Sequence, residues 1–183
     1  MKKIAFLFVL LVILSAIPSI LILLNGSFPF WYDPARDLFS ALANHQKITL
    51  IGPPSGIPGV YYGPFWIWLL SIFTLISLHP AIIILLTLTL PYFIVGPLIL
   101  WKLKKTLGLK TIFLFWGTFA LFYDKYFTQL WNPHPAPLVF LAVIFFVATG
   151  SPFLAGVSAG LLANFHMAFG IGIILATAIF FWK

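Results

Sequence analysis

This 183-residue chain has no cysteine and no glutamate, and only 7% of its residues are charged. The lack of cysteine excludes disulfides, thiolate metal sites and cysteine nucleophiles. An ordinary soluble domain carries ~25% charged residues, so this chain cannot cover a surface that faces water. Hydrophobic residues make up 62% of it, which also excludes intrinsic disorder. We therefore expect an all-α, polytopic membrane protein, with three aspartates and four histidines available for acid–base chemistry.

Basic residues outnumber acidic ones by ten to three, giving a net charge of +7. They are few and stand beside apolar runs, which is typical of membrane topology signals rather than of nucleic-acid binding. The bilayer is therefore the expected partner, and we expect no nucleic acid.

Apolar runs of roughly 20 residues are long enough to cross a bilayer as helices. Residues 4–24 form such a run behind Lys2 and Lys3, and the positive-inside rule places these lysines in the cytoplasm. About six transmembrane helices are expected in all. The others are residues 81–101, 111–127, 137–149, 153–165 and 168–182.

The apolar run at residues 65–78 has two interpretations. If it spans the membrane, the lysines at 102–110 fall outside, against the positive-inside rule. It has only ~14 residues, which is short for a span, and Trp66 and Trp68 are typical of the interface. We take it as an interfacial or re-entrant helix, so that residues 25–79 form one extracytoplasmic loop with interfacial helices.

This topology separates the charges. The acids and histidines all fall on the outer side: Asp33, Asp37, Asp124, His45, His79, His134 and His166. Lysines mark the inner side: Lys2, Lys3, the 102–110 cluster and Lys183. Ionisable groups gathered at one interface of a membrane protein indicate a functional site there.

Residues 34–45 can form a short helix on the membrane surface, with Asp33 as N-cap and Pro34 as the first helical residue. Asp33 and Asp37 are four residues apart and lie near one face, with Arg36 between them. A carboxylate there can act as a general base, and Arg36 can bind a phosphate. In the simpler alternative, Asp33 only caps the helix and Arg36 only pairs with Asp37.

Three further segments carry polar residues, each with a structural alternative. The Gly/Pro-rich stretch 52–64 lacks the pattern of a phosphate loop, and is either a cavity wall or a connector. Asn132 and His134 lie in WNPHP at 131–135, which could simply be a rigid turn with an aromatic anchor. His166 lies at a helix end, where histidine is more often a hydrogen-bonded terminus than a ligand. The histidines show no metal-ligand spacing.

Several of these segments together resemble a known family. YDPARD at 32–37, GPP at 52–54, GVYYGPFW at 59–66, LWNPHPAP at 130–137 and LLANFH at 161–166 occur in a familiar order. In order and spacing they resemble the N-terminal half of bacterial and archaeal GT-C glycosyltransferases. That superfamily includes protein O-mannosyltransferases, lipid A aminoarabinose transferases and, in particular, RgtA/B/C/D-like membrane proteins. The resemblance covers nearly the whole chain.

The resemblance implies a multi-pass protein of the bacterial or archaeal plasma membrane with its active face outside. Its implied reaction is inverting transfer of a sugar from a polyprenyl-phosphate donor to a hydroxyl of a lipid, glycan or protein acceptor. Asp33 occupies the position of the catalytic base. The candidate substrate-binding residues are Arg36, Asp37, Tyr61, Tyr62, Asn132, His134 and His166, with Arg36, His134 and His166 considered for the phosphate.

The chain also departs from the family. Pro34 stands where relatives often carry an acid, and Asp124 matches a second acidic position only weakly. The acidic cluster that binds metal in the oligosaccharyltransferase branch has no counterpart, so we expect no cofactor, although metal dependence stays open. Because relatives are far longer, residues 1–183 are expected to be the N-terminal transmembrane portion of a longer protein. Such a fragment would lack part of the site and could be inactive alone.

Two other classes compete with the enzyme. A non-enzymatic transporter or lipid-binding membrane protein is the main alternative, but the spans have no central charges and no internal repeat. A structural assembly subunit is favoured only by the GxxxG face of Gly156 and Gly160, with Ala155 and Ala159 beside it. Small residues at this spacing predict close helix packing.

Overall fold

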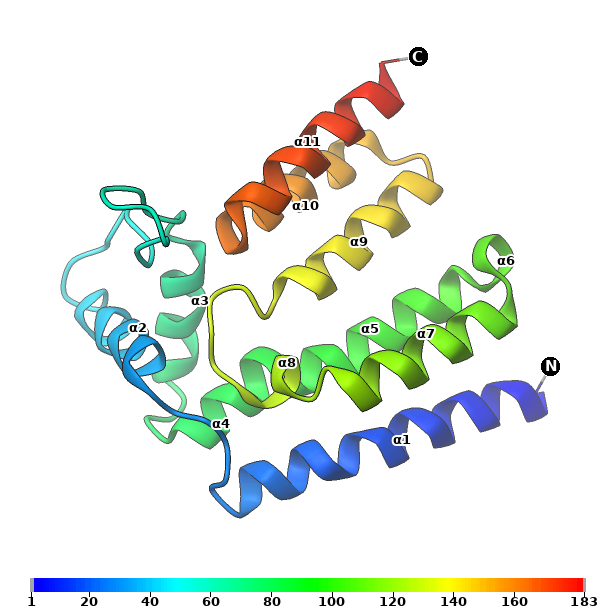
Figure 1. Ribbon diagram of the computed structural model, residues 1–183, viewed down its shortest axis with the longest axis horizontal. Coiled ribbons are helices and arrows are strands. Elements are labelled where there is room, and N and C mark those ends of the chain that lie inside the picture. Colours follow the sequence, from blue (N-terminus) through cyan, green and yellow to red (C-terminus); the bar gives the residue numbers. More distant parts are fainter. Residues whose placement is uncertain (1, 183) are drawn as a thin grey trace.

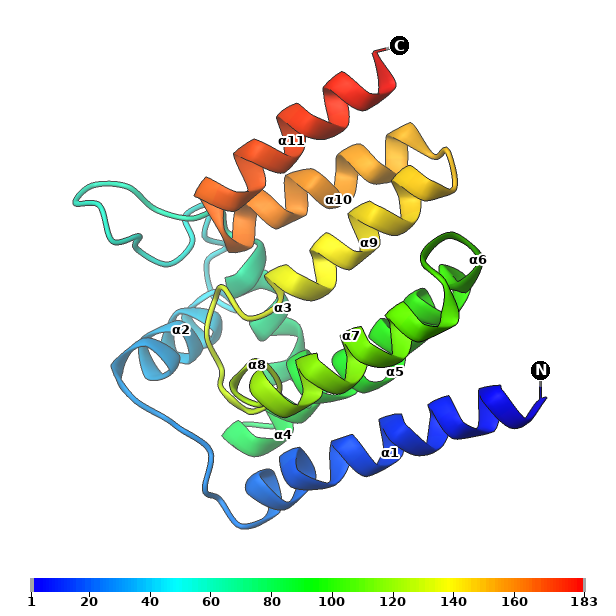
Figure 2. The same cartoon turned by 45° about the vertical axis from the view of Figure 1, so that its right-hand side comes forward.

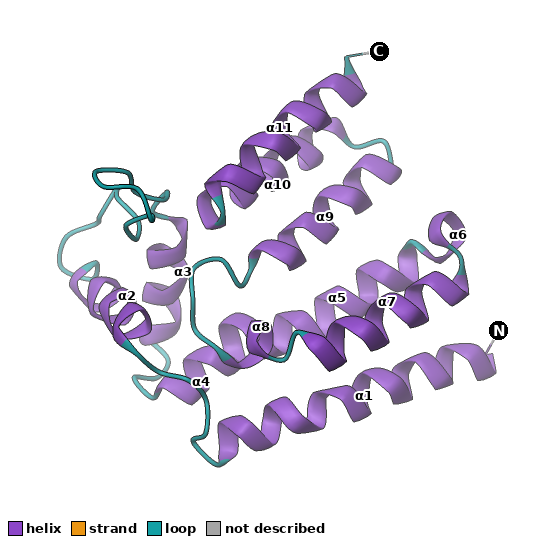
Figure 3. Ribbon diagram, in the orientation of Figure 1, coloured by secondary structure: helices purple, strands orange, loops and turns teal. Residues whose placement is uncertain are grey.

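A computed structural model describes residues 2–182, and in this part of the chain it is helical, with no strands (Figure 3). The all-α prediction is therefore confirmed. Lys183, expected on the inner side, lies outside the described residues.

The helices follow the apolar runs of the sequence closely. One continuous helix covers Pro80–Lys102, with a π-helical segment at Leu85–Thr89 between two α-helical segments, Pro80–Ile84 and Leu90–Lys102. In chain order, the elements are α1 (Lys2–Leu24), α2 (Tyr32–Ala43), α3 (Phe65–Thr74), α4 (Pro80–Ile84), η1 (Leu85–Thr89), α5 (Leu90–Lys102), α6 (Lys104–Leu107), α7 (Leu109–Phe122), α8 (Lys125–Thr128), α9 (Ala136–Ala148), α10 (Pro152–Phe165) and α11 (Met167–Phe181).

The long helices run back and forth between two ends of the molecule (Figures 1 and 2). One end, here called the α2–α3 end, holds α2, α3 and the loop between them. The opposite α6 end holds the start of α1, α6 and the turn between α9 and α10. The segments predicted to face the outside and the lysines predicted to face the inside are thus at opposite ends of the helices.

Two helices are long and apolar enough to cross a membrane: Lys2–Leu24 and Pro80–Lys102. The other apolar helices are shorter. Four of them have 13 to 15 residues, or about 20–22 Å at 1.5 Å per residue: α7, α9, α10 and α11. Membrane crossing by these four helices stays a prediction.

Several predicted helix boundaries are wrong: the helix expected at 34–45 ends at Ala43, and the run at 65–78 is helical only to Thr74. The expected helix over 111–127 ends at Phe122, because Tyr123 leaves helical geometry (φ −126°, ψ 34°). A separate turn, α8, then begins, with the Asp124 carboxylate accepting from the Lys125 backbone N–H at 2.9 Å. In addition, Asp33 is not an N-cap: α2 begins at Tyr32 after Trp31, and Asp33 lies in its first turn.

The small-residue face predicted on α10 is right for its alanines and wrong for its glycines. A Cβ added at Gly156 or Gly160 would meet no atom within 4 Å, so these glycines permit no close helix contact within the described chain. The packed face of α10 carries Ala155 and Ala159, both fully buried. Close backbone approach occurs instead at Gly170, where an added Cβ would lie 2.2 Å from the Ala163 Cα. The α10–α11 crossing therefore depends on Gly170.

Candidate functional site

Arg36 on α2 binds both neighbouring carboxylates. Its Nη1 lies 2.7 Å from Asp33 Oδ1, and its Nε and Nη2 lie 2.8 and 2.7 Å from Asp37 Oδ1. The helical spacing brings the three side chains to one side of α2, as the sequence predicted. The simpler alternative is therefore right that Arg36 pairs with Asp37, but the same guanidinium also holds Asp33.

The two carboxylates have different environments. Asp37 is 1% exposed, and its second oxygen, Oδ2, accepts the Trp66 indole N–H from α3 at 2.9 Å. Burial raises the pKa of the Asp37 carboxyl, while the Arg36 and Trp66 hydrogen bonds and the Arg36 charge lower it. Asp33 is 32% exposed, and in residues 2–182 its Oδ2 has no hydrogen-bond partner. Asp33 is thus the carboxylate that a ligand can reach, and Asp37 holds Arg36 in place.

A pocket of about 330 Å³ lies between α2 and the loop that follows it. Arg36, Lys47 and Tyr61 line it, together with an apolar wall that includes Pro53 and Ile67. Lys47 makes no ion pair within residues 2–182. The pocket therefore presents N–H and O–H donors beside an aromatic ring, a lining suited to a polar ligand with acceptor oxygens.

The Gly/Pro-rich stretch forms part of the wall of this pocket. The Gly52 N–H donates to the Tyr62 carbonyl at 3.0 Å, and the Tyr62 N–H donates to the Pro53 carbonyl at 2.9 Å. A Cβ on Gly52 would lie 2.0 Å from the Gly63 carbonyl oxygen, so only glycine fits. Of the two alternatives for this stretch, the cavity wall is the observed one. Tyr61 lines the pocket, whereas Tyr62 contributes these backbone bonds.

A second set of contacts locks α2 to α3. His45 Nε2 lies 2.9 Å from the Ser71 carbonyl and 3.1 Å from the Thr74 hydroxyl. The Asn44 amide donates to Ser71 Oγ at 3.0 Å, and the Ser71 hydroxyl lies 3.0 Å from the Ala41 carbonyl and 2.7 Å from the Ile67 carbonyl of its own helix. The helix pair that carries Asp33 and Trp66 is therefore held together independently of the Arg36 cluster.

The sequence motifs meet at this end of the molecule. Asn132 of WNPHP donates through Nδ2 to the Phe165 carbonyl at 3.0 Å. The Phe165 ring packs against Trp66, with centroids 6.2 Å apart. Trp31, just before α2, packs against Trp131, with centroids 6.4 Å apart. Four segments far apart in the sequence thus form one region around α3.

The two candidate histidines play different parts. His134 is 4% exposed, its Nδ1 lies 2.7 Å from the Gln129 carbonyl, and burial lowers the pKa of its ring to about 4. A ring that is neutral at pH 7 adds no positive charge beside a phosphate, and the substrate-binding role of His134 stays a prediction. His166 joins α10 to α11, as expected of a helix-terminal histidine. Its buried Nδ1 and the buried Asn132 Oδ1 have no partner within the described chain.

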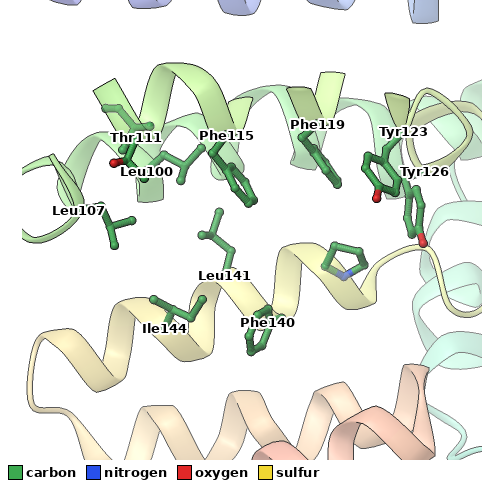
Figure 4. A pocket seen from close by; sticks show the side chains of 12 residues that line it. Leu100, Leu107, Thr111, Phe115, Phe119, Tyr123, Tyr126, Phe140, Leu141 and Ile144 are labelled. Carbon is green, nitrogen blue, oxygen red and sulfur yellow. The ribbon is translucent and has the colours of Figure 1, made fainter. Parts of the chain in front are cut away.

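An apolar groove of about 510 Å³ runs between α7 and α9 (Figure 4). Leu107 lies at one end, Phe115 and Leu141 in the middle, and Tyr123 and Tyr126 at the other end. The Tyr126 ring is 4.7 Å from the His134 ring, so the tyrosine end adjoins the WNPHP loop. The lining of the groove is almost wholly apolar, which suits a flexible hydrocarbon chain.

Several residues were missed or are placed apart. Trp66 and Lys47 were not predicted as site residues. The partner of Trp66, Asp37, lies on another segment, and no local pattern marks Lys47 as lining a pocket. Asp124 caps α8 and has no contact with Arg36. Within residues 2–182, no three acidic, histidine or cysteine side chains are grouped to hold a metal.

No family model, no curated protein and no solved structure matches this chain. The GT-C resemblance therefore stays a prediction from the motifs, and the function must be argued from the site.

Proposed function

We propose that this chain belongs to a GT-C-type membrane glycosyltransferase. It transfers a sugar from a polyprenyl-phosphate donor to an acceptor hydroxyl at the outer face of a bacterial or archaeal membrane. The observation that carries the proposal is the Asp33 carboxylate, which is partly exposed, held by Arg36 and situated at one end of an apolar helix bundle. A catalytic base at the interface needs this combination of access and fixed geometry.

The proposed reaction uses groups of this chain. Asp33 Oδ2 accepts the proton of the acceptor hydroxyl while that oxygen attacks the anomeric carbon. The bond from this carbon to the phosphate oxygen breaks, and the electron pair leaves with polyprenyl phosphate. Negative charge grows on that phosphate, and positively charged donors stabilise it. Arg36 and Lys47 at the neighbouring pocket are the cations available for this role.

The apolar groove supports a lipid-linked donor. A polyprenyl chain is a flexible hydrocarbon, and the α7–α9 groove offers about 510 Å³ of apolar space. Its tyrosine end adjoins the WNPHP loop, at which the headgroup would emerge. The four short helices would require local thinning of a bilayer whose core is typically ~30 Å thick.

The test is Asp33→Asn in the full-length protein, reconstituted in liposomes with a labelled polyprenyl-phosphate sugar and a mixture of acceptors. Loss of a general base should lower kcat by roughly 10²–10⁴-fold while folding is retained. Asp124→Asn is the matched control, since Asp124 is an aspartate with no contact to Arg36. Full activity of Asp33→Asn would refute the role of Asp33.

The groove favours one alternative, a lipid-binding membrane protein without catalysis. Such a protein would bind polyprenyl phosphate but would transfer no sugar, in the wild type or in either aspartate variant. The same liposome assay separates the two functions by measuring donor binding and transfer together.

A further inference from the structure

Trp66 makes a buried polar contact that packing alone does not explain. It is the second residue of α3 and is fully buried. Its indole N–H crosses from α3 to α2 and donates to Asp37 Oδ2 at 2.9 Å. Asp37 Oδ1 accepts from Arg36, and Arg36 in turn holds Asp33. One continuous chain of hydrogen bonds therefore links a buried tryptophan to a partly exposed carboxylate.

We propose that Trp66 is a positioning residue, which through Asp37 fixes the Arg36 guanidinium and thereby the carboxylate of Asp33. The hydrogen-bond chain stands on its own geometry, but the consequence for catalysis rests on the function proposed for Asp33.

The geometry explains why the indole is needed. Asp37 is 1% exposed, so an oxygen that lost its donor would not regain one from water. An unsatisfied buried acceptor is costly, and the carboxylate would rotate to share its bonds with Arg36. Rotation of Asp37 moves the guanidinium fork, because two of its N–H groups bind a single Asp37 oxygen. The third, Nη1, would then change its angle to Asp33.

A purely structural role is a weaker explanation. The other ends of α2 and α3 are already joined through His45, Asn44 and Ser71. The Trp66 ring also packs on Phe165 without using its N–H. Replacing the indole by a phenyl ring should therefore preserve the helix pair and remove the hydrogen bond alone.

The chain's three acids make the test direct, because protein labelled with ¹³C at the aspartate γ-carbon gives only three side-chain carboxyl signals. In nanodiscs, Trp66→Phe should shift the Asp37 titration to higher pH, since a bond to its ionised form is lost. Trp116→Phe is the matched control: Trp116 is equally buried but donates to Ser15, away from Asp37. In the transfer assay, Trp66→Phe should lower kcat roughly 10–100-fold with KM unchanged.

A second measurement needs no variant. In the wild-type chain, one tryptophan indole N–H signal should follow the Asp37 carboxyl signal with the same titration midpoint. If no indole signal does so, or if Trp66→Phe and Trp116→Phe shift Asp37 equally, the proposal is overturned. An unchanged kcat in Trp66→Phe also overturns it. If Asp37 responds as expected but the wild-type protein transfers no sugar, the hydrogen-bond chain stands and the proposed function fails.

Discussion

At the scale of single residues, His134 makes stability depend on pH. Its ring is 4.7 Å from Tyr126 and 5.3 Å from Trp131, and it is affected by the charge of Lys125. Its pKa falls from 6.5 to about 4 on folding, so between these pH values the unfolded chain binds a proton that the folded chain does not. The contribution of His134 to the free energy of unfolding is therefore fully present above pH 6.5 and is lost as the pH falls toward 4.

We expect His134→Gln to lose most of this pH dependence, worth at most about 3 kcal/mol. The measurement is unfolding of both proteins in one detergent from pH 7.5 to pH 4. Asp37, with its raised pKa, contributes with the opposite sign, but it is present in both proteins and cancels in the difference. His79→Gln, at an exposed histidine, is the control. Equal pH slopes for wild type and His134→Gln would contradict the prediction.

The side-chain contacts that the sequence predicted correctly are those between residues of the same helix. Asp33, Arg36 and Asp37 could be grouped from sequence because helical periodicity alone brings them together. Trp66 is 29 positions from Asp37, and its contact depends on how α3 packs against α2. No periodic pattern encodes that approach, so the partner of Asp37 could not be predicted.

At the scale of elements, two glycines in neighbouring helices test where the chain packs closely. Gly170→Ala places a Cβ 2.2 Å from the Ala163 backbone and must push α10 and α11 apart. Such overpacking costs typically 1–3 kcal/mol. Gly156→Ala meets no atom within 4 Å and should gain up to ~1 kcal/mol of helix propensity. Thermal unfolding should rank Gly156→Ala at or above wild type and Gly170→Ala below it. The reverse order would mean that the GxxxG face carries the contact.

The sequence predicted where helices exist, but it did not predict their exact boundaries or the π-helical segment. The apolar runs mark every lengthwise helix, because length and hydrophobicity are properties of one segment. No pattern within one segment marks the break at Tyr123, the π-helix at Leu85–Thr89 or the start of α2. Thr89 illustrates this, since its hydroxyl donates to the Phe127 carbonyl at 2.6 Å, 38 positions away. Asp33 does not cap α2 because it lies inside the first turn of the helix, after Trp31 and Tyr32.

At the scale of the whole molecule, α3 decides the topology. With ten residues, or about 15 Å at the helical rise, it is half the length of a typical hydrocarbon core. It lies at the α2–α3 end, opposite the lysines of α6 (Figure 1). If α3 does not cross, residues 25–79 lie on one side of the membrane and the lysines at 102–110 lie on the other. The positive-inside rule then places the Arg36 cluster outside.

Because the chain has no cysteine, single cysteines report this topology directly. Ser55→Cys and Ser77→Cys, which lie before and after α3, should both react with a membrane-impermeant thiol reagent added to intact cells. Thr106→Cys, in α6 at the opposite end, should react only after permeabilisation. Reaction of Ser77→Cys only from the cytoplasmic side would show that α3 spans the membrane. The lysines at 102–110 would then be outside, and the α9–α10 turn with them, while Asp33 would remain on the outer side, since it precedes α3.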